Sequence, residues 1–335
     1  MDERIAGALH LLPNYLAQHV LLSASALTLG VVISVPLAVL ASRYRGLRWP
    51  TLATAGLVQT IPGLALLALF YPLLLGLSEV TTALFGVGIP ALGFLPSLLA
   101  LTLYSMLPIL RNGVAGLTGL NPAIIEAADG VGMTPRQRLM QVELPLAAPV
   151  LMAGIRTAAV WTIGAATLST PIGQTSLGNF IFSGLQTENW VFVLVGCAAA
   201  AVLALIVDQL LGLIEAGLAR RERRRLGLGL VGLGVAIAAA LVPLRSQGQS
   251  AYVIGSKNFA EQFILGELIG ELLQRQGLAV DHKDNLGSAT IFRALVSNDI
   301  DVYVDYAGTL WTNVLKRQDV LADDAMLREL TRAVH

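Results

Sequence analysis

Charged residues are scarce in this 335-residue chain, at 13% of the total, whereas 55% of its residues are hydrophobic. That balance excludes a disordered protein and argues against an ordinary soluble one. Only one cysteine is present, Cys197, so the sequence offers neither a disulfide framework nor a cysteine metal site. The composition therefore predicts a chain that lies mostly in a lipid bilayer.

The few charges are unevenly distributed along the chain. Residues 1–249 contain 14 Lys+Arg and 10 Asp+Glu, a net charge of +4, whereas residues 250–335 contain 8 and 12, a net charge of −4. All three lysines lie in the second part, namely Lys257, Lys283 and Lys316. This split predicts two environments, a membrane for the first part and water for the second.

Six windows free of charged residues are long enough to cross a bilayer, which takes about 20 apolar helical residues. The acidic start of the chain, Met1-Asp2-Glu3, argues against a cleaved signal peptide. The predicted membrane helices lie near residues 20–42, 51–75, 92–111, 150–171, 190–213 and 226–244.

Arginines mark alternate loops between these windows, near residues 43–48, 111–138 and 220–225. Cytoplasmic loops retain positive charge, so six crossings place these loops in the cytoplasm and both termini outside it. We expect a multi-pass protein of the bacterial cytoplasmic (inner) membrane, and a DNA-binding role for the basic run at 220–225 is a poor alternative to a stop signal.

The loop at residues 121–145 is predicted to hold two short helices. Asn121 and Thr134 are each followed by proline, the pattern of a helix N-cap with proline at the first position. A break is expected at Gly130 to Gly132, with Gly132 in the left-handed backbone geometry that a residue with a Cβ disfavours. Pro145 is expected to prevent continuation of the second helix. The loop has too few cations for DNA, so no nucleic-acid partner is expected.

The spacing within this loop resembles the EAA loop of ABC-importer permeases. Glu126-Ala127-Ala128 is followed after three residues by Gly132, then after nine by Val142, and after one more by Leu144-Pro145. In that family the first short helix is a coupling helix that docks on the ATP-binding subunit. The resemblance implies this role for Glu126, Ala127, Ala128 and Gly132.

No Gly-Lys pair occurs in the sequence, so a phosphate-binding loop for ATP is excluded. The resemblance then implies a transporter subunit rather than an enzyme, with no cofactor in this chain and ATP bound by a separate ABC ATP-binding subunit. It also implies a second permease copy, as a homodimer, to engage two such subunits.

Two further segments are similar to permeases of the glycine betaine/choline (osmoprotectant) uptake group, Leu144 to Thr157 and Gly178 to Phe182. The implied fold is an α-helical membrane protein with a type I ABC importer permease fold and about six transmembrane helices. We expect a permease domain at 1–218 with its EAA loop at 121–145. A basic segment and a tethering helix are expected at 219–249.

The last 86 residues read as an α/β unit. A strand is predicted at Tyr252–Gly255, an amphipathic helix at Glu261–Gln274 and another strand at Asp301–Val304. Strands that alternate with helices indicate a parallel sheet, whose ligands bind at the carboxyl ends of the strands. That rule points to Ser256–Asn258 and Tyr306–Thr309 as a ligand edge.

This region resembles the periplasmic binding proteins of the same osmoprotectant systems. The matching segments are Gly255 to Phe259 with Glu261-Gln262, Gly287 to Thr290, and Asp301 to Thr309, where Ala307 departs from the family's usual threonine. The resemblance implies that Tyr306 is one wall of an aromatic box for a quaternary ammonium head. Lys257 and Thr309 correspond to donors for a ligand carboxylate.

In that family the binding protein has two lobes. Residues 250–335 are therefore expected to be the N-terminal part of the substrate-binding domain, a partial α/β periplasmic-binding-protein lobe with the second lobe absent. The sixth helix is expected to place this domain on the outer, periplasmic side.

The resemblance implies a permease with a fused substrate-binding domain of an ATP-driven importer for glycine betaine, choline or related solutes. Alternatives left open are another zwitterion, such as carnitine or ergothioneine, and a solute-sensing membrane receptor. The intact EAA spacing argues against a receptor, which needs no coupling helix.

Overall fold

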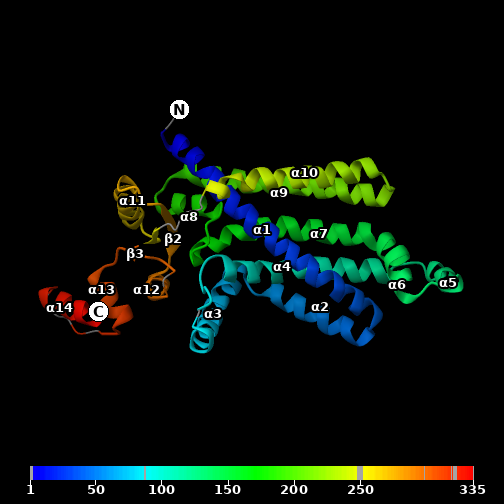
Figure 1. Cartoon of the computed structure of the whole chain (residues 1–335), viewed down its shortest axis with the longest axis horizontal. Helices are drawn as coiled ribbons and strands as arrows, with labels where there is room; N and C mark the ends of the chain where they lie inside the picture. Colours follow the sequence, from blue (N-terminus) through cyan, green and yellow to red (C-terminus); the bar gives the residue numbers. More distant parts are fainter. Residues whose placement is uncertain are drawn as a thin grey trace.

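The computed structural model describes residues 3–86, 88–246, 252–297, 299–317, 319 and 323–334. Long helices form a bundle, a loop with the short helices α5 (Pro122–Gly130) and α6 (Pro135–Arg138) lies at one end, and a small α/β domain lies at the other (Figure 1). The predicted domain boundary at 249/250 lies outside the described residues.

The bundle consists of long helices interrupted at few points. Within the described residues, six helical runs are long and apolar enough to cross a membrane: Arg4–Arg43, Gly63–Phe85, Phe94–Thr118, Pro135–Ile172, Trp190–Arg220 and Arg223–Leu244. They contain α1 (Glu3–Arg43), α3 (Gly63–Phe85), α4 (Phe94–Thr118), α7 (Leu144–Ala166), α9 (Trp190–Arg220) and α10 (Arg223–Leu241). The count of about six spans agrees with the prediction from charge-free windows.

The prediction of one helix at 51–75 was wrong. The chain instead forms α2 (Arg45–Thr60) and α3, separated at Ile61 and Pro62. Proline disfavours helical geometry in the residue before it, and the Tyr104 hydroxyl donates a hydrogen bond to the Ile61 carbonyl at the break. As a result, α2 runs alongside α1 and α4, and α3 turns crosswise at the end of the bundle (Figure 1).

The three arginine-bearing segments gather at one end of the bundle. The turn between α1 and α2, the α5–α6 region and the turn between α9 and α10 all lie at the end opposite the α/β domain (Figure 1). The arginine-bearing loops therefore lie together at one end, which is the arrangement that their predicted placement on one side of the membrane requires.

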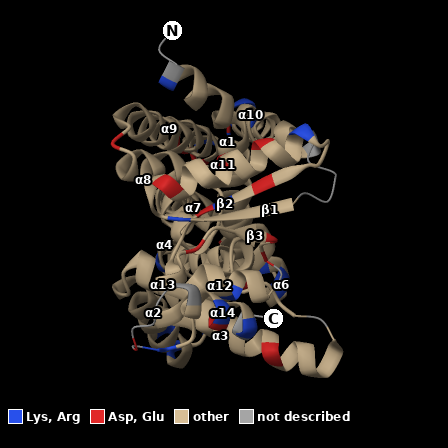
Figure 2. Cartoon of the chain, turned by 90° about the vertical axis from the view of Figure 1, so that its left-hand side faces the viewer, with Lys and Arg blue, Asp and Glu red and all other residues tan. Residues whose placement is uncertain are grey.

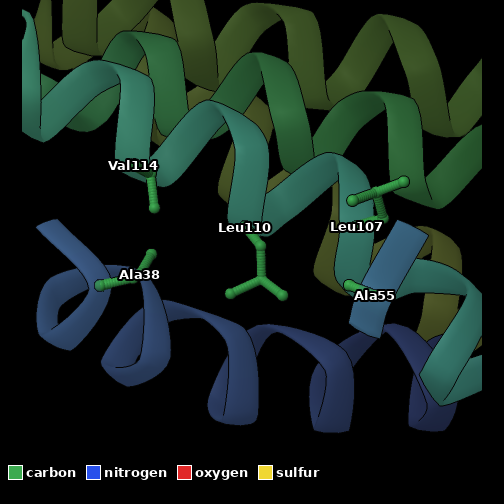
Figure 3. Packing of buried hydrophobic residues seen from close by; sticks show 6 residues of the cluster. Ala38, Ala55, Leu107, Leu110 and Val114 are labelled. Atoms are coloured by element: carbon green, nitrogen blue, oxygen red, sulfur yellow. The ribbon is translucent and has the colours of Figure 1, made fainter. Parts of the chain in front are cut away.

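Small residues allow the central helices of the bundle to approach closely. A cluster of Ala38, Ala55, Leu107, Leu110 and Val114 joins α1, α2 and α4 (Figure 3). A Cβ atom on Gly113 would lie 2.8 Å from that of Ala38, and one on Gly154 would lie 2.6 Å from the carbonyl oxygen of Pro108. Close backbone approach of this kind is the usual source of helix association in lipid.

Among its described residues, the C-terminal domain contains a three-stranded parallel sheet of order β2-β1-β3. The strands are β1 (Tyr252–Lys257), β2 (Val280–Leu286) and β3 (Val302–Tyr303), and β1 lies in register with β2 from Tyr252 opposite Val280. The helix α11 (Ala260–Arg275) lies on one side of the strands and α12 (Ser288–Val296) on the other (Figure 2). The predicted parallel α/β unit is confirmed, and β2 is a strand that the sequence analysis missed.

The helix α11 presents a different face to the sheet from the one its apolar residues suggest. Ile264, Leu268 and Leu272 are 68%, 54% and 53% exposed, whereas Gly266 and Gly270 are buried. A Cβ atom on Gly270 would lie 2.9 Å from the His282 ring. The glycines let the helix lie close to the sheet, so the apolar stripe faces outward.

The α/β domain and the bundle share an apolar cluster. Leu92, in the turn before α4, is 3% exposed and packs with Leu286, Ile291, Ala294 and Ile300 of the C-terminal domain. This contact fixes the end of the sheet against the end of the bundle.

The remaining elements lie partly in the bundle and partly in the C-terminal domain. They are η1 (Leu139–Glu143), η2 (Thr167–Ile172), α8 (Gly178–Gln186), η3 (Val242–Ser246), α13 (Ala307–Thr309), η4 (Leu310–Val314) and α14 (Asp323–Val334).

Candidate functional site

The loop with the EAA-like spacing forms the two short helices that the sequence predicts, α5 (Pro122–Gly130) and α6 (Pro135–Arg138). The Asn121 side chain accepts a hydrogen bond from the backbone N–H of Ala123, with an N···O distance of 3.0 Å. Thr134 and Gln137 form a capping box, in which each side chain accepts from the other's backbone N–H. These local bonds fix both helix starts without help from the rest of the chain.

Gly132 adopts the left-handed backbone geometry that we expected, with φ of +81°. Its N–H donates to the carbonyl of Asp129 at 3.0 Å, which reverses the chain after α5. No heavy atom of the described residues lies within 4 Å of the place where a Cβ would sit. A side chain at this position would therefore be disfavoured by backbone strain and not by a clash.

The four residues assigned to coupling differ in exposure. Glu126, Ala127 and Gly132 are exposed, whereas Ala128 is only 6% exposed and faces the chain itself. Two apolar residues that the sequence analysis did not select, Ile124 and Val131, are 40% and 76% exposed on the same short segment. Their spacing of three to four residues from Ala127 could have identified them as one helical face.

Pro145 does not end the second short helix, contrary to our expectation. The residues of η1 form a π-helical turn that runs directly into α7, with Pro145 in the first turn of α7. The N–H of Leu144 bonds to the carbonyl of Leu139, one residue further back than in an α-helix. The wider turn accommodates the proline, so α6, η1 and α7 make one continuous run.

In the C-terminal domain, the structure brings Lys257 and Tyr306 together at the carboxyl end of the sheet. Lys257 ends β1, and its Nζ lies 5.8 Å from the centre of the Tyr306 ring. Tyr306 is 44% exposed and caps α13, and the N–H of Thr309 donates to the Tyr306 carbonyl at 2.9 Å. The three predicted ligand residues thus share one edge.

The charge of Lys257 is already paired. Its side chain is fully buried and forms an ion pair with Asp305, which is 6% exposed. Tyr303 donates its hydroxyl hydrogen to the other oxygen of Asp305 at 2.8 Å. The pKa of Tyr303 is raised mainly by burial and further by this hydrogen bond. Sequence reasoning did not give Asp305 a role, although it lies next to Tyr306.

The hydroxyl of Tyr306 is also engaged, as the donor of a hydrogen bond to Glu261 at the start of α11. That bond raises the pKa of Tyr306 and lowers the pKa of Glu261. It orients the tyrosine ring across the gap between α11 and α13. The edge therefore offers one oriented aromatic ring beside a neutralised charge pair, an arrangement that suits an organic cation.

Two family models match consecutive parts of the chain. The model described as binding-protein-dependent transport system inner membrane component matches residues 30–220, more than half of the chain. The model described as substrate binding domain of ABC-type glycine betaine transport system matches residues 250–330.

Curated relatives match one or both parts. The choline transport system permease protein OpuBB of Bacillus subtilis is 38% identical over 209 residues, which cover 62% of this chain and 89% of that protein. The ergothioneine transport permease/ergothioneine binding protein EgtU of Helicobacter pylori is 31% identical over 280 residues, which cover 79% of this chain and 48% of EgtU.

A solved structure of the MetNI methionine ABC transporter in an inward-facing conformation has the same fold. It aligns with a TM-score of 0.51 at 21% identity and covers 66% of this chain and 99% of that one. The bundle thus has the permease fold of type I ABC importers, joined to an α/β binding domain. With a family match over most of the membrane region, the chain belongs to the inner membrane components of binding-protein-dependent transport systems.

Proposed function

We propose that this transporter subunit is the permease, with a fused substrate-binding domain, of an ATP-driven importer for quaternary ammonium osmoprotectants such as glycine betaine and choline. The observation that carries the proposal is the order of the two family matches, a permease at 30–220 and a binding domain at 250–330 in one chain. In this proposal the domains span 1–218, 219–249 and 250–335.

Coupling to a separate ATP-binding subunit is assigned to the exposed face of α5. Ile124 and Ala127 are exposed there, Val131 is exposed directly after the helix, and Glu126 is exposed about a quarter turn around from Ala127, so a partner would bury an apolar patch with a carboxylate at its edge. Ala128 supports this face from inside, and Gly132 sets the reversal that keeps α5 projecting from the bundle. A second copy of the permease, as a homodimer, would present a second α5 to a second ATP-binding subunit.

Replacing Gly132 by valine tests the coupling role, because valine strongly disfavours a φ of +81°. In the reconstituted transporter, Gly132→Val should abolish uptake and substrate-stimulated ATP hydrolysis while leaving solute binding unchanged. Gly130→Val is the matched control, since Gly130 lies in the same segment with negative φ and open space beside it among the described residues. Normal uptake by Gly132→Val would mean that the loop only connects two helices.

The C-terminal domain is assigned to the outer, periplasmic side, because it lies at the bundle end opposite the arginine-bearing turns (Figure 1). Single cysteines at Gln137 and Glu271, introduced after Cys197→Ala, test this placement in intact cells. Position 137 should react only after the membrane is made permeable, and position 271 should react from outside. Labelling of both from the same side would refute the assignment.

The proposed ligand site uses Tyr306 for the ammonium head and Lys257 and Thr309 for a carboxylate tail. The ion pair with Asp305 favours the head group, because it offsets a lysine charge that would otherwise repel a cation beside the ring. A ligand carboxylate would then compete with Asp305 for Lys257, so a carboxylate is expected to add less affinity than the ring does.

Equilibrium binding of radiolabelled choline and glycine betaine to the purified full chain tests this site. Tyr306→Ala should weaken both by about five- to thirtyfold, the equivalent of roughly 1–2 kcal/mol for one ring. Tyr252→Ala is the matched control, because Tyr252 is similarly exposed at the opposite end of β1. Equal affinities of Tyr306→Ala and the parent chain would remove Tyr306 from the site.

A second candidate ligand is another zwitterion of the carnitine or ergothioneine type. The observation that favours it is the match to EgtU, which extends over 280 residues and so covers both parts of this chain. Competition decides between the candidates. Displacement of bound choline by ergothioneine at much lower concentration than by glycine betaine would favour the second candidate.

A further inference from the structure

Glu143 is a buried carboxylate shared by two arginines from distant parts of the sequence. Its side chain is 12% exposed and ends the π-helical turn η1. One oxygen accepts a hydrogen bond from Arg138 Nε at 2.8 Å, and the other accepts from Arg43 Nη2 at 3.0 Å. Arg43 is the last residue of α1, one hundred positions earlier, so Glu143 joins the loop to the end of the first helix.

Arg138 extends this connection to α5. Its Nη1 lies 2.6 Å from both carboxylate oxygens of Asp129, which belongs to α5. The guanidinium therefore spans from Asp129 on one edge to Glu143 on another, and its side chain is 19% exposed. Alternating charges run without a gap from α5 to α1, in the order Asp129, Arg138, Glu143 and Arg43.

The geometry of this series is held on both sides. The capping box of Thr134 and Gln137 fixes the start of α6, which carries Arg138, and Glu143 leads directly into α7. Movement of Asp129 away from Arg138, or of Glu143 away from Arg43, would remove one of the two ion pairs of a mostly buried charge, which is unfavourable. Displacement of α5 is therefore expected to carry the other members with it.

We infer that Arg138 and Glu143 are positioning residues that transmit movement of α5 to the end of α1. This inference deepens the proposed coupling role of α5 and rests on it. The partner's movement would reach the bundle by two routes, the covalent run from α6 into α7 and the ion-pair series into α1. The second route couples helices that the sequence separates widely.

Uptake per ATP hydrolysed, measured with the reconstituted transporter, tests the inference. Glu143→Gln keeps the shape of the side chain but removes its charge, and Arg43→Gln removes the far partner. Each should lower uptake per ATP by about fivefold or more, within the usual range of coupling between sites, while basal ATP hydrolysis stays unchanged. Arg43→Lys should restore part of the loss.

Two further variants separate transmission from simple folding. Arg45→Gln is the control, because Arg45 is exposed in the same turn and forms no ion pair with the residues that the structure describes. It should behave as the parent chain does. The double variant Glu143→Gln/Arg43→Gln should lower uptake per ATP no more than either single variant does, since both substitutions interrupt the same series of ion pairs. Additive losses would overturn the inference.

A readout without transport distinguishes failure of this inference from failure of the proposed function. In the Cys197→Ala background, Tyr44→Cys places a probe beside Arg43, and its labelling rate should change when the ATP-binding partner is trapped with ATP and vanadate. Glu143→Gln should abolish that change. If choline and glycine betaine are not transported but this response is seen, only the substrate assignment fails.

An unaltered labelling response in Glu143→Gln would overturn the inference. So would loss of the ATP-binding partner from the purified Glu143→Gln transporter, because Glu143 would then maintain the docking loop itself.

Discussion

Exposed aliphatic side chains have opposite meanings in α9 and α11. In α9, Leu194, Val202 and Leu205 are 69%, 54% and 59% exposed, and in α11 the stripe of Ile264, Leu268 and Leu272 is exposed to the same degree. Hydrocarbon covers the first set at no cost, whereas water meets the second set unless protein covers it. Similar exposed fractions therefore describe a lipid-covered helix surface in the bundle and an uncovered apolar surface in the C-terminal domain.

Charged groups differ between the same two regions in how their partners are arranged. In the bundle, Arg156 of α7 holds Asp208 of α9 with one nitrogen–oxygen distance of 2.7 Å, and its third nitrogen lies 3.4 Å from Glu215. These three residues therefore pair across two helices of the bundle, and their side chains remain 22–35% exposed. In the C-terminal domain, the Lys257–Asp305 pair is buried more completely.

Breaking the buried pair of the C-terminal domain should give the largest effect on stability. Lys257→Met leaves Asp305 buried without its partner and should lower the free energy of unfolding by about 3–5 kcal/mol. Chemical denaturation monitored by the fluorescence of Trp311, which lies in this domain, would measure it. Lys257→Met/Asp305→Leu should recover most of the loss.

The surface pair of Arg275 and Glu271 supplies the control, because both side chains are more than half exposed. Arg275→Met should change the free energy of unfolding by less than about 1 kcal/mol. If the two methionine variants lost the same stability, burial would not be what distinguishes the pairs.

A glycine substitution in the bundle should have the next largest effect. Gly154→Ala puts a Cβ atom 2.6 Å from the Pro108 carbonyl oxygen and should destabilise the α4–α7 contact by about 1–3 kcal/mol. Gly164→Ala is the matched control on the same helix, with open space beside it among the described residues. Thermal unfolding in lipid nanodiscs compares them, and equal midpoints would show that close approach contributes little here.

The smallest expected effect concerns pH and Asp284 at the end of β2. Burial raises the pKa of Asp284, although Ser256 donates a hydrogen bond to it. A raised folded-state pKa means that the free energy of unfolding decreases once the pH exceeds the ordinary value of about 3.9. Asp284→Asn should therefore raise the melting temperature at neutral pH but not in acid.

The exposed neighbour Asp281 is the control for that measurement. Asp281→Asn should shift the melting temperature little at either pH. A stabilisation by Asp284→Asn that was equally large in acid would point to packing rather than to the ionised carboxylate.

Local patterns were sufficient to predict several features. Apolar windows between arginines located the bundle, proline after Asn121 and Thr134 located two helix starts, and the spacing of Gly132 predicted its positive φ. Each of these depends on the residue and its near neighbours, or on hydropathy over one helix length. The structure reproduces them for that reason.

The features that sequence analysis missed depend on contacts between distant residues. At the break between α2 and α3, Tyr104 of α4 donates a hydrogen bond to the Ile61 carbonyl. The strand β2 is a polar run that pairs with β1. Glu143 pairs with Arg43, which lies one hundred residues earlier in the sequence. Only the glycines of α11 left a local signal, since Gly266 and Gly270 repeat every four residues on the face that approaches the sheet.

The position of Leu92 has a kinetic consequence for the C-terminal domain. Its side chain belongs to the bundle but lies in the same apolar cluster as Leu286 and Ile300. Separation of the two parts therefore opens a packed interior, and its rate is set by a local unfolding barrier. We therefore expect the domain to stay docked until this local unfolding occurs. A domain held only by a flexible tether would instead bind and leave the bundle at the rate of diffusion.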